Sequence, residues 1–145
     1  MKKAALIFGS GFDIPDVFKD KKEIKIKTLY GEPDSLLVEG EYKNRNIVLM
    51  QRHGKDHKLP AFQINYKANL YALRELGVDN IIAISYCGSL QEEICLGEFV
   101  IFDQFIDLTR FHDITFIDKI DSKKLNWIQL FYYPESTSSF SDHLH

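Results

Sequence analysis

The sequence predicts an α/β protein with a largely parallel sheet, and three features carry this prediction. A wholly apolar run at residues 4–8 stops at a glycine, as is typical of a strand buried on both faces of a parallel sheet. Apolar residues recur at near-helical spacing over residues 61–76, and Gly77 fits the position just past the end of that helix. A second apolar run, expected to be another buried strand, follows at residues 80–85. The order strand, helix, strand is the βαβ unit of an α/β sheet.

Three further strands are expected before the helix and one after the βαβ unit. The alternation of isoleucine and lysine over residues 24–28 predicts a half-exposed strand. Residues 35–41 and 46–51 predict two strands that a polar connection joins into a hairpin. Residues 98–102, which are mostly apolar, predict one more strand.

Length and composition exclude several classes of protein. The chain has 145 residues, which suits a single domain, and its 45% hydrophobic content with a net charge of −3 excludes disorder for most of it. The slightly acidic balance argues against a nucleic-acid partner. No apolar run approaches the ~18 residues that cross a bilayer, and the first apolar stretch is too short for an export signal. We therefore expect a cytoplasmic protein that binds neither nucleic acid nor membrane.

The cysteines and histidines do not form a metal-site pattern. Cys87 and Cys95 stand eight residues apart and neither belongs to a CxxC motif, so two reduced thiols are expected. His53 and His57 are four residues apart, but no HExxH motif is present and the segment reads as a loop. The sequence thus predicts no metal site.

Three loops leave the carboxyl ends of expected strands, where open α/β sheets bind ligands. Residues 9–11 combine two glycines, which permit close backbone approach to an anion, with the hydroxyl donor of Ser10. Arg52 offers a planar fork of donors suited to phosphate, and the ring of His53 can also donate. Residues 85–89 add small and hydroxyl side chains. Together the loops predict an anion pocket. The alternatives are a structural turn at residues 9–11, a solvated basic loop at Arg52 and His53, and a plain exit from the strand at residues 85–89.

The loops belong to longer motifs. These are IFGSG at 7–11, YGEPD at 30–34, RHGKDH at 52–57, INYKAN at 64–69, LRELG at 73–77, CGSL at 87–90 and DQFID at 103–107. With them the chain resembles the 5′-methylthioadenosine phosphorylase / purine nucleoside phosphorylase family over about residues 1–118. The pair RHGxxH and INYxAN points to the methylthioadenosine-type branch. The resemblance implies the N-terminal part of the nucleoside phosphorylase fold, with a mixed, largely parallel sheet and flanking helices.

The resemblance also implies a reaction and its participants. Phosphate attacks the anomeric carbon of a purine nucleoside, such as methylthioadenosine, and releases the base and a pentose 1-phosphate. Inorganic phosphate is a co-substrate, no metal or organic cofactor is implied, and the family typically assembles as a homo-oligomer, a trimer. Tyr86 stands where the family usually has a small residue, often Ala. By position, the implied phosphate-binding residues are Ser10, Arg52, His53 and Ser85, and the implied substrate-pocket residues are Tyr86, Cys87 and Gly88.

The likeness to the family ends near residue 118. Its members are about twice as long, and their second half supplies further contacts, including the aspartate that recognises the purine. We therefore expect residues 1–118 to form the N-terminal half of a phosphorylase-like domain. Residues 119–145 are expected to be a divergent, disordered tail whose composition resembles out-of-frame translation. No catalytic residue is assigned, and the truncated chain is expected to be inactive alone. The alternative is a non-catalytic remnant that binds phosphate or nucleoside, or an oligomer partner.

Overall fold

The computed structural model describes residues 2–9, 14–54, 59–106, 108 and 116. The chain divides into two units, Met1–Cys87 and Gly88–His145, and each is considered by itself. Ser10, Gly11, His57 and the expected tail at 119–145 lie outside the described residues.

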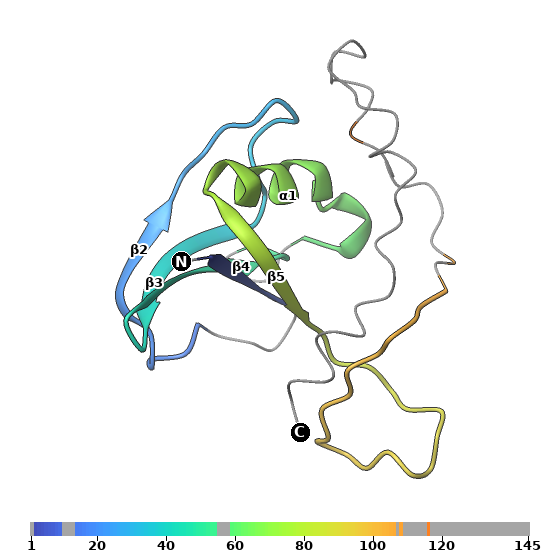
Figure 1. The fold of residues 1–145 in the computed structure, drawn as a ribbon. Coiled ribbons are helices and arrows are strands. Elements are labelled where there is room, and N and C mark those ends of the chain that lie inside the picture. Colours follow the sequence, from blue (N-terminus) through green and yellow to red (C-terminus); the bar gives the residue numbers. More distant parts are fainter. Residues whose placement is uncertain (1, 10–13, 55–58, 107, 109–115, 117–145) are drawn as a thin grey trace. The chain divides into compact units, whose positions relative to one another are not determined.

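The first unit contains a five-stranded mixed sheet with one α-helix against it (Figure 1). The strands run in the order β2-β3-β4-β1-β5. β1 pairs in parallel with β4 on one side and with β5 on the other, whereas β2, β3 and β4 pair antiparallel. The predicted α/β class and mixed sheet are confirmed. The elements are β1 (Lys3–Phe8), β2 (Lys19–Ile24), β3 (Leu36–Tyr42), β4 (Arg45–Gln51), a 3-10 turn (Ala61–Gln63), α1 (Tyr66–Glu75) and β5 (Val78–Ile84).

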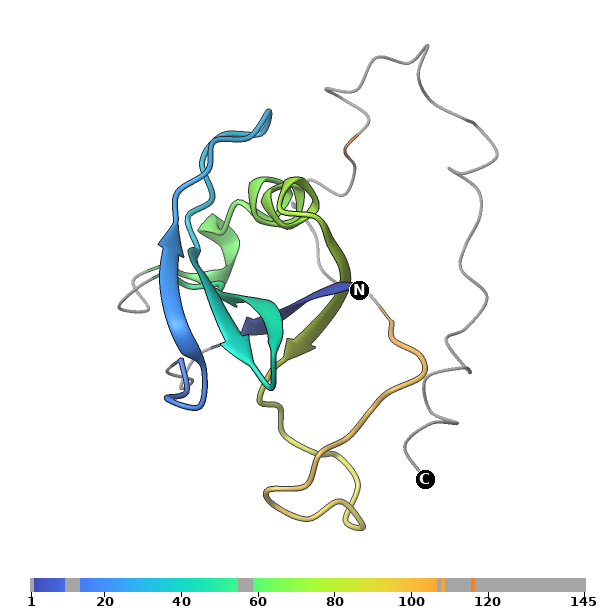
Figure 2. The same ribbon diagram turned by 60° about the vertical axis from the view of Figure 1, so that its left-hand side comes forward.

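Side chains alternate between two apolar layers along the central strands. Ala5, Val48 and Met50 pack with Ala72 and Leu73 of α1, which lies over one face of the sheet (Figure 2). On the other face a second cluster is formed by Phe8, Phe18, Val38 and Leu49. β1 and β4 therefore contribute side chains to both layers, as the continuous apolar run at residues 4–8 predicted.

The helix begins later than the sequence predicted. Residues 61–63 form a 3-10 turn, and α1 starts after Asn65, whose side-chain Oδ1 accepts a hydrogen bond from the Ala68 backbone N–H at 3.0 Å. The Asn65 amide also donates to the Tyr30 carbonyl at 2.9 Å, which ties the helix start to the preceding turn. At the other end Gly77 has a φ of +73° and donates to the Arg74 carbonyl, so the predicted C-terminal glycine is confirmed.

Three strand predictions need correction. The strand expected at residues 24–28 lies instead at Lys19–Ile24, a charged edge strand defined by pairing with β3 rather than by apolar alternation. β5 is not a buried strand: it lies at an edge of the described sheet, paired with β1, and its Ile81 and Ile82 side chains are each 46% exposed. Residues 98–102 are described but form no strand.

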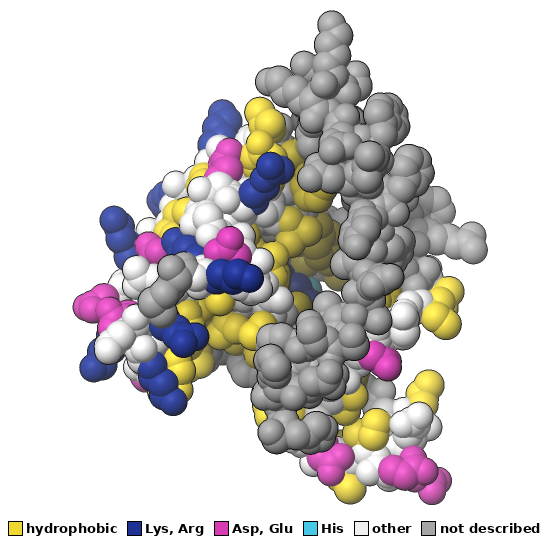
Figure 3. Space-filling view, viewed as in Figure 1, with side chains coloured by type: hydrophobic (Ala, Val, Ile, Leu, Met, Phe, Trp, Pro, Cys, Tyr) yellow, Lys and Arg dark blue, Asp and Glu magenta, His cyan; other side chains and the backbone are white. Residues whose placement is uncertain are grey.

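The described surface carries charges of both signs. In the view of Figure 3, basic and acidic side chains intermingle on the side of the first unit that carries β2. Among the helices of the described ranges, none has the length and apolar character to cross a membrane.

Candidate functional site

The three parallel strands bring the ends of three loops together at one edge of the sheet. Phe8 of β1 pairs with Gln51 of β4 and with Ile84 of β5. The next residues along the chain are Gly9, Arg52 and Ser85, so the register places these three side by side where the strands end. Three of the four predicted phosphate-binding residues thus lie together, since Arg52 contacts both His53 and Ser85. The fourth, Ser10, follows Gly9 outside the described residues.

Arg52 is fixed by its backbone and by both sides of its guanidinium. Its backbone N–H donates to the Phe8 carbonyl at 3.1 Å, and its own carbonyl accepts from the Ser35 hydroxyl at 3.2 Å. The guanidinium Nε donates to His53 Nε2 at 3.1 Å, and Nη2 donates to Ser85 Oγ at 3.2 Å. The guanidinium therefore bridges the loops after β4 and β5.

Two glycines make room for this arrangement. Gly9 is buried, and a Cβ at this position would lie 2.8 Å from Arg52 Nη2. Gly54 closes the turn after β4 by donating to the Gln51 carbonyl at 3.0 Å, and its φ is +76°. A Cβ on Gly54 would also approach the Asp34 carbonyl to 3.2 Å. Both glycines stood in the sequence motifs, but their neighbours could not be read from the sequence.

The charge of Arg52 has no acidic counterpart in the part of the chain that the structure describes. The ion pairs found there join Lys3 to Glu39 and Lys21 to Asp16, whereas the partners of the Arg52 side chain, His53 and Ser85, carry no negative charge. A cation held by neutral groups leaves its charge available to an anionic ligand. Within the same ranges, no group of three histidine, cysteine or acidic side chains is placed to hold a metal ion.

The three predicted substrate-pocket residues are all exposed. Tyr86 is 71% exposed, and Cys87 carries an exposed free thiol. Gly88 is exposed and belongs to the second unit. These residues follow Ser85 directly in the chain. In the described structure none of the three lines a buried pocket.

Comparisons with known proteins identify the family to which the chain is similar. The sequence model of the Phosphorylase superfamily matches residues 3–142. S-methyl-5′-thioadenosine phosphorylase of Thermofilum pendens is 47% identical over 116 residues, which are 80% of this chain and 44% of the relative. The corresponding protein of Danio rerio is 41% identical over 116 residues, or 41% of its length.

Solved structures extend the likeness to three dimensions. Methylthioadenosine phosphorylase from Schistosoma mansoni, in complex with adenine, matches with a TM-score of 0.74 and 42% identity. The match covers 80% of this chain and 42% of that one. This chain thus spans less than half the length of the relatives it matches. The family match over most of the sequence and the shared fold together show that the chain belongs to the phosphorylase superfamily.

Proposed function

We propose that Arg52 and Ser85 bind inorganic phosphate, as the phosphate subsite for phosphorolysis of a purine nucleoside of the 5′-methylthioadenosine type. The observation that carries this proposal is the guanidinium of Arg52, which is held beside a glycine by two side chains that carry no negative charge. The names of the relatives support the nucleoside class. Ser10, which follows Gly9 in the sequence and lies outside the described residues, stays a predicted phosphate ligand.

The donors left on these two side chains suit a phosphate ion. A guanidinium has five N–H groups, and His53 and Ser85 engage two of them on Arg52. The Ser85 hydroxyl accepts from Arg52, so its own proton remains to be donated. The subsite can therefore present a fork of N–H groups and a hydroxyl to the same anion, which is the geometry that guanidinium–phosphate recognition uses.

The proposed reaction needs phosphate to be held beside the sugar. A phosphate oxygen forms a bond to the anomeric carbon while the bond from that carbon to the purine nitrogen breaks, and the purine leaves with the electron pair. The sugar becomes oxocarbenium-like in the transition state, and a phosphate fixed next to it stabilises the developing positive charge. In this chemistry Arg52 and Ser85 orient the nucleophile and do not themselves transfer a proton.

A phosphate titration tests the subsite. Calorimetry on the full chain should give phosphate binding that weakens about 10- to 100-fold in Arg52→Ala, because a charge-assisted hydrogen bond is worth ~1.5–3 kcal/mol. Arg45→Ala is the matched control, since Arg45 is exposed at the opposite end of the same strand. Equal affinities of the wild type and Arg52→Ala would remove Arg52 from the subsite.

A second assay separates phosphorolysis from binding without catalysis. The second candidate function is a non-catalytic binder of phosphate or nucleoside, in which Arg52 and Ser85 hold the anion and no reaction follows. We expect the 145-residue chain to bind phosphate and to release no adenine from methylthioadenosine. Phosphate-dependent adenine release that disappears in Arg52→Ala would instead assign phosphorolysis to this chain.

Further proposals concern the location, the oligomeric state and the cofactors of the protein. We propose a cytoplasmic homo-oligomer, a trimer as in the family resemblance, that uses phosphate and no metal or organic cofactor. The exposed apolar side chains of Ile81 and Ile82 on β5 are compatible with association. Sedimentation of the chain at several concentrations tests the oligomer, and a single monomeric species throughout would contradict it.

A further inference from the structure

We infer that the imidazole ring of His53 is a positioning group: it holds the guanidinium of Arg52 in place, and the ring itself does not donate a hydrogen bond to phosphate. The effect of His53 on phosphate affinity rests on the proposed function. The contacts of its ring do not depend on any ligand. This positioning role differs from the role expected from the sequence, in which His53 was one of the phosphate ligands.

The partners of the two ring nitrogens determine where the proton of His53 lies. Nδ1 lies 2.8 Å from the Leu59 carbonyl oxygen, which can only accept, so Nδ1 carries the proton. Nε2 lies 3.1 Å from Arg52 Nε, which can only donate, so Nε2 is the unprotonated acceptor. Both contacts are satisfied only by the neutral ring with its proton on Nδ1. In that form Nε2 has no proton to offer an anion.

Two hydrogen bonds with Leu59 keep the ring in this orientation. The Leu59 backbone N–H donates to the His53 carbonyl at 3.3 Å, so residues 53 and 59 exchange two hydrogen bonds, one from the ring and one to the backbone. Gly54 supplies the positive φ with which the loop begins. The ring is thereby anchored to its own loop on one side and to Arg52 on the other.

The consequence is a guanidinium held at two separate atoms. His53 holds Nε, and Ser85 holds Nη2 from the neighbouring loop. An arginine side chain that makes no other contact loses conformational entropy when it binds a ligand. A side chain held in this way has lost most of that entropy before the ligand binds. His53 therefore raises the affinity for phosphate through Arg52.

Two matched variants separate the two ring contacts. In His53→Asn the amide nitrogen can replace Nδ1 as donor to the Leu59 carbonyl, but the acceptor for Arg52 is lost. In His53→Gln the amide oxygen can replace Nε2 as acceptor. We expect phosphate binding to weaken about tenfold in His53→Asn and clearly less in His53→Gln. Equal weakening in both variants, or a larger loss in His53→Gln, would contradict the inference.

A double-mutant cycle distinguishes positioning from direct binding. Lysine at position 52 keeps the positive charge but lacks the Nε donor that His53 accepts. If His53 acts through Arg52, His53→Asn should weaken phosphate binding in the wild type and have no further effect in Arg52→Lys. If the ring contacts phosphate directly, the same loss appears in both backgrounds, and the positioning role is overturned.

Nitrogen NMR tests the geometry without reference to phosphate affinity. In the free, uniformly ¹⁵N-labelled chain, we expect His53 to show a protonated Nδ1 and a bare Nε2, assigned by loss of the signals in His53→Asn. The Arg52 Nε–H signal should shift in that variant. The tautomer should persist at saturating phosphate; a proton on Nε2 in either state would overturn the inference. The expected tautomer without any phosphate binding would refute the proposed function alone.

Discussion

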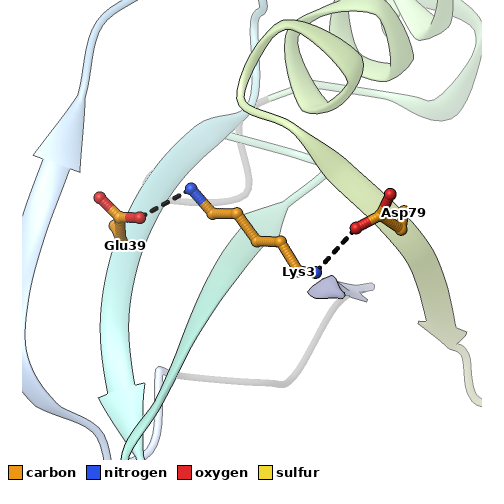
Figure 4. A network of polar contacts seen from close by, with 3 residues as sticks. All are labelled: Lys3, Glu39 and Asp79. Carbon is orange, nitrogen blue, oxygen red and sulfur yellow. Dashed lines mark hydrogen bonds and ion pairs between the residues drawn. The ribbon is translucent and has the colours of Figure 1, made fainter. Parts of the chain in front are cut away.

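The two ends of the parallel strands carry polar networks that differ in how they treat positive charge. At the amino end, Lys3 Nζ forms an ion pair with Glu39 Oε1 at 2.8 Å, and the Lys3 backbone N–H donates to Asp79 Oδ2 at 2.9 Å (Figure 4). At the carboxyl end, Arg52 is held by His53 and Ser85, which are neutral. At the amino end the charge of Lys3 is thus neutralised by Glu39. At the carboxyl end no described carboxylate neutralises Arg52.

The difference follows from what each network is required to satisfy. The pairing of β1 with β5 shifts register between Lys3 and Ala4, so that Asp79 lies between the paired residues Val78 and Asn80. Its carboxylate accepts the Lys3 N–H at this irregularity, which is a structural role. At the carboxyl end the backbone contacts are already made by Phe8 and Ser35, and the guanidinium is not needed to complete them. The guanidinium of Arg52, which no described carboxylate neutralises, is therefore the better candidate for binding an anion.

We expect the largest loss of stability from a substitution in the middle of β4, the strand that links the two ends of the sheet. β4 lies between β3 and β1, and Leu49 within it is fully buried. Leu49→Ala should lower the free energy of unfolding by about 2–5 kcal/mol through lost burial and a residual cavity. Chemical denaturation measures this loss. Leu96→Ala, at an exposed position, should change stability by less than ~0.5 kcal/mol; similar losses in both would contradict the described core.

A carboxylate introduced beside Arg52 should neutralise its charge, as Glu39 neutralises Lys3 at the amino end. In Ser85→Asp, the new side chain can pair with Arg52 and repels a phosphate ion, since like charges brought together cost several kcal/mol. We expect phosphate affinity to fall more than about 100-fold, against about 10-fold in Ser85→Ala, where only a neutral hydroxyl is lost. Calorimetric titration compares the two. The comparison between the ends fails if Ser85→Asp binds phosphate as Ser85→Ala does.

Gly9→Ala should disturb the carboxyl end alone. The added methyl group would meet Arg52 Nη2 at 2.8 Å, so the guanidinium must move away from Ser85. Because the atom that moves is the end of a flexible side chain, we expect a stability loss of at most about 1 kcal/mol but phosphate binding weakened roughly tenfold. In an Arg52→Ala background the same substitution should leave phosphate binding unchanged, and any further loss there would point to a different cause.

The smallest effect is expected at the amino end. Glu39→Gln removes the ion pair with Lys3, whose two side chains are 25% and 34% exposed, and should cost no more than about 1 kcal/mol. Phosphate affinity should stay at the wild-type value, because the substitution leaves every contact of Arg52 in place. Asp16→Asn, which removes the exposed pair with Lys21, is the matched control and should cost less still. A loss of phosphate affinity in Glu39→Gln would show that the two ends are coupled.

Local patterns predicted the elements whose signals lie within a few residues. The apolar run of β1, the hairpin of β3 and β4 and the glycine that ends α1 depend on side-chain periodicity and turn chemistry, and all three are found. The start of α1 was misplaced because residues 61–63 share the apolar spacing, while the actual helix start is the cap formed by Asn65. That cap was available as a sequence signal, since asparagine is a favoured residue at the helix start.

By itself, the sequence determined the α/β class, the family and the loops that meet at the carboxyl ends of the strands. Only the tertiary structure decided which strands became edges, because β2 and β5 take their burial from neighbours distant in the sequence. It likewise decided the roles within the site. The acceptor that fixes the tautomer of His53 is the backbone carbonyl of Leu59, and the space for Arg52 is the missing Cβ of Gly9. The glycine at position 9 was visible in the sequence, but the side chain that fills the space beside it, and the backbone carbonyl that the His53 ring contacts, depend on how the folded backbone brings these segments together.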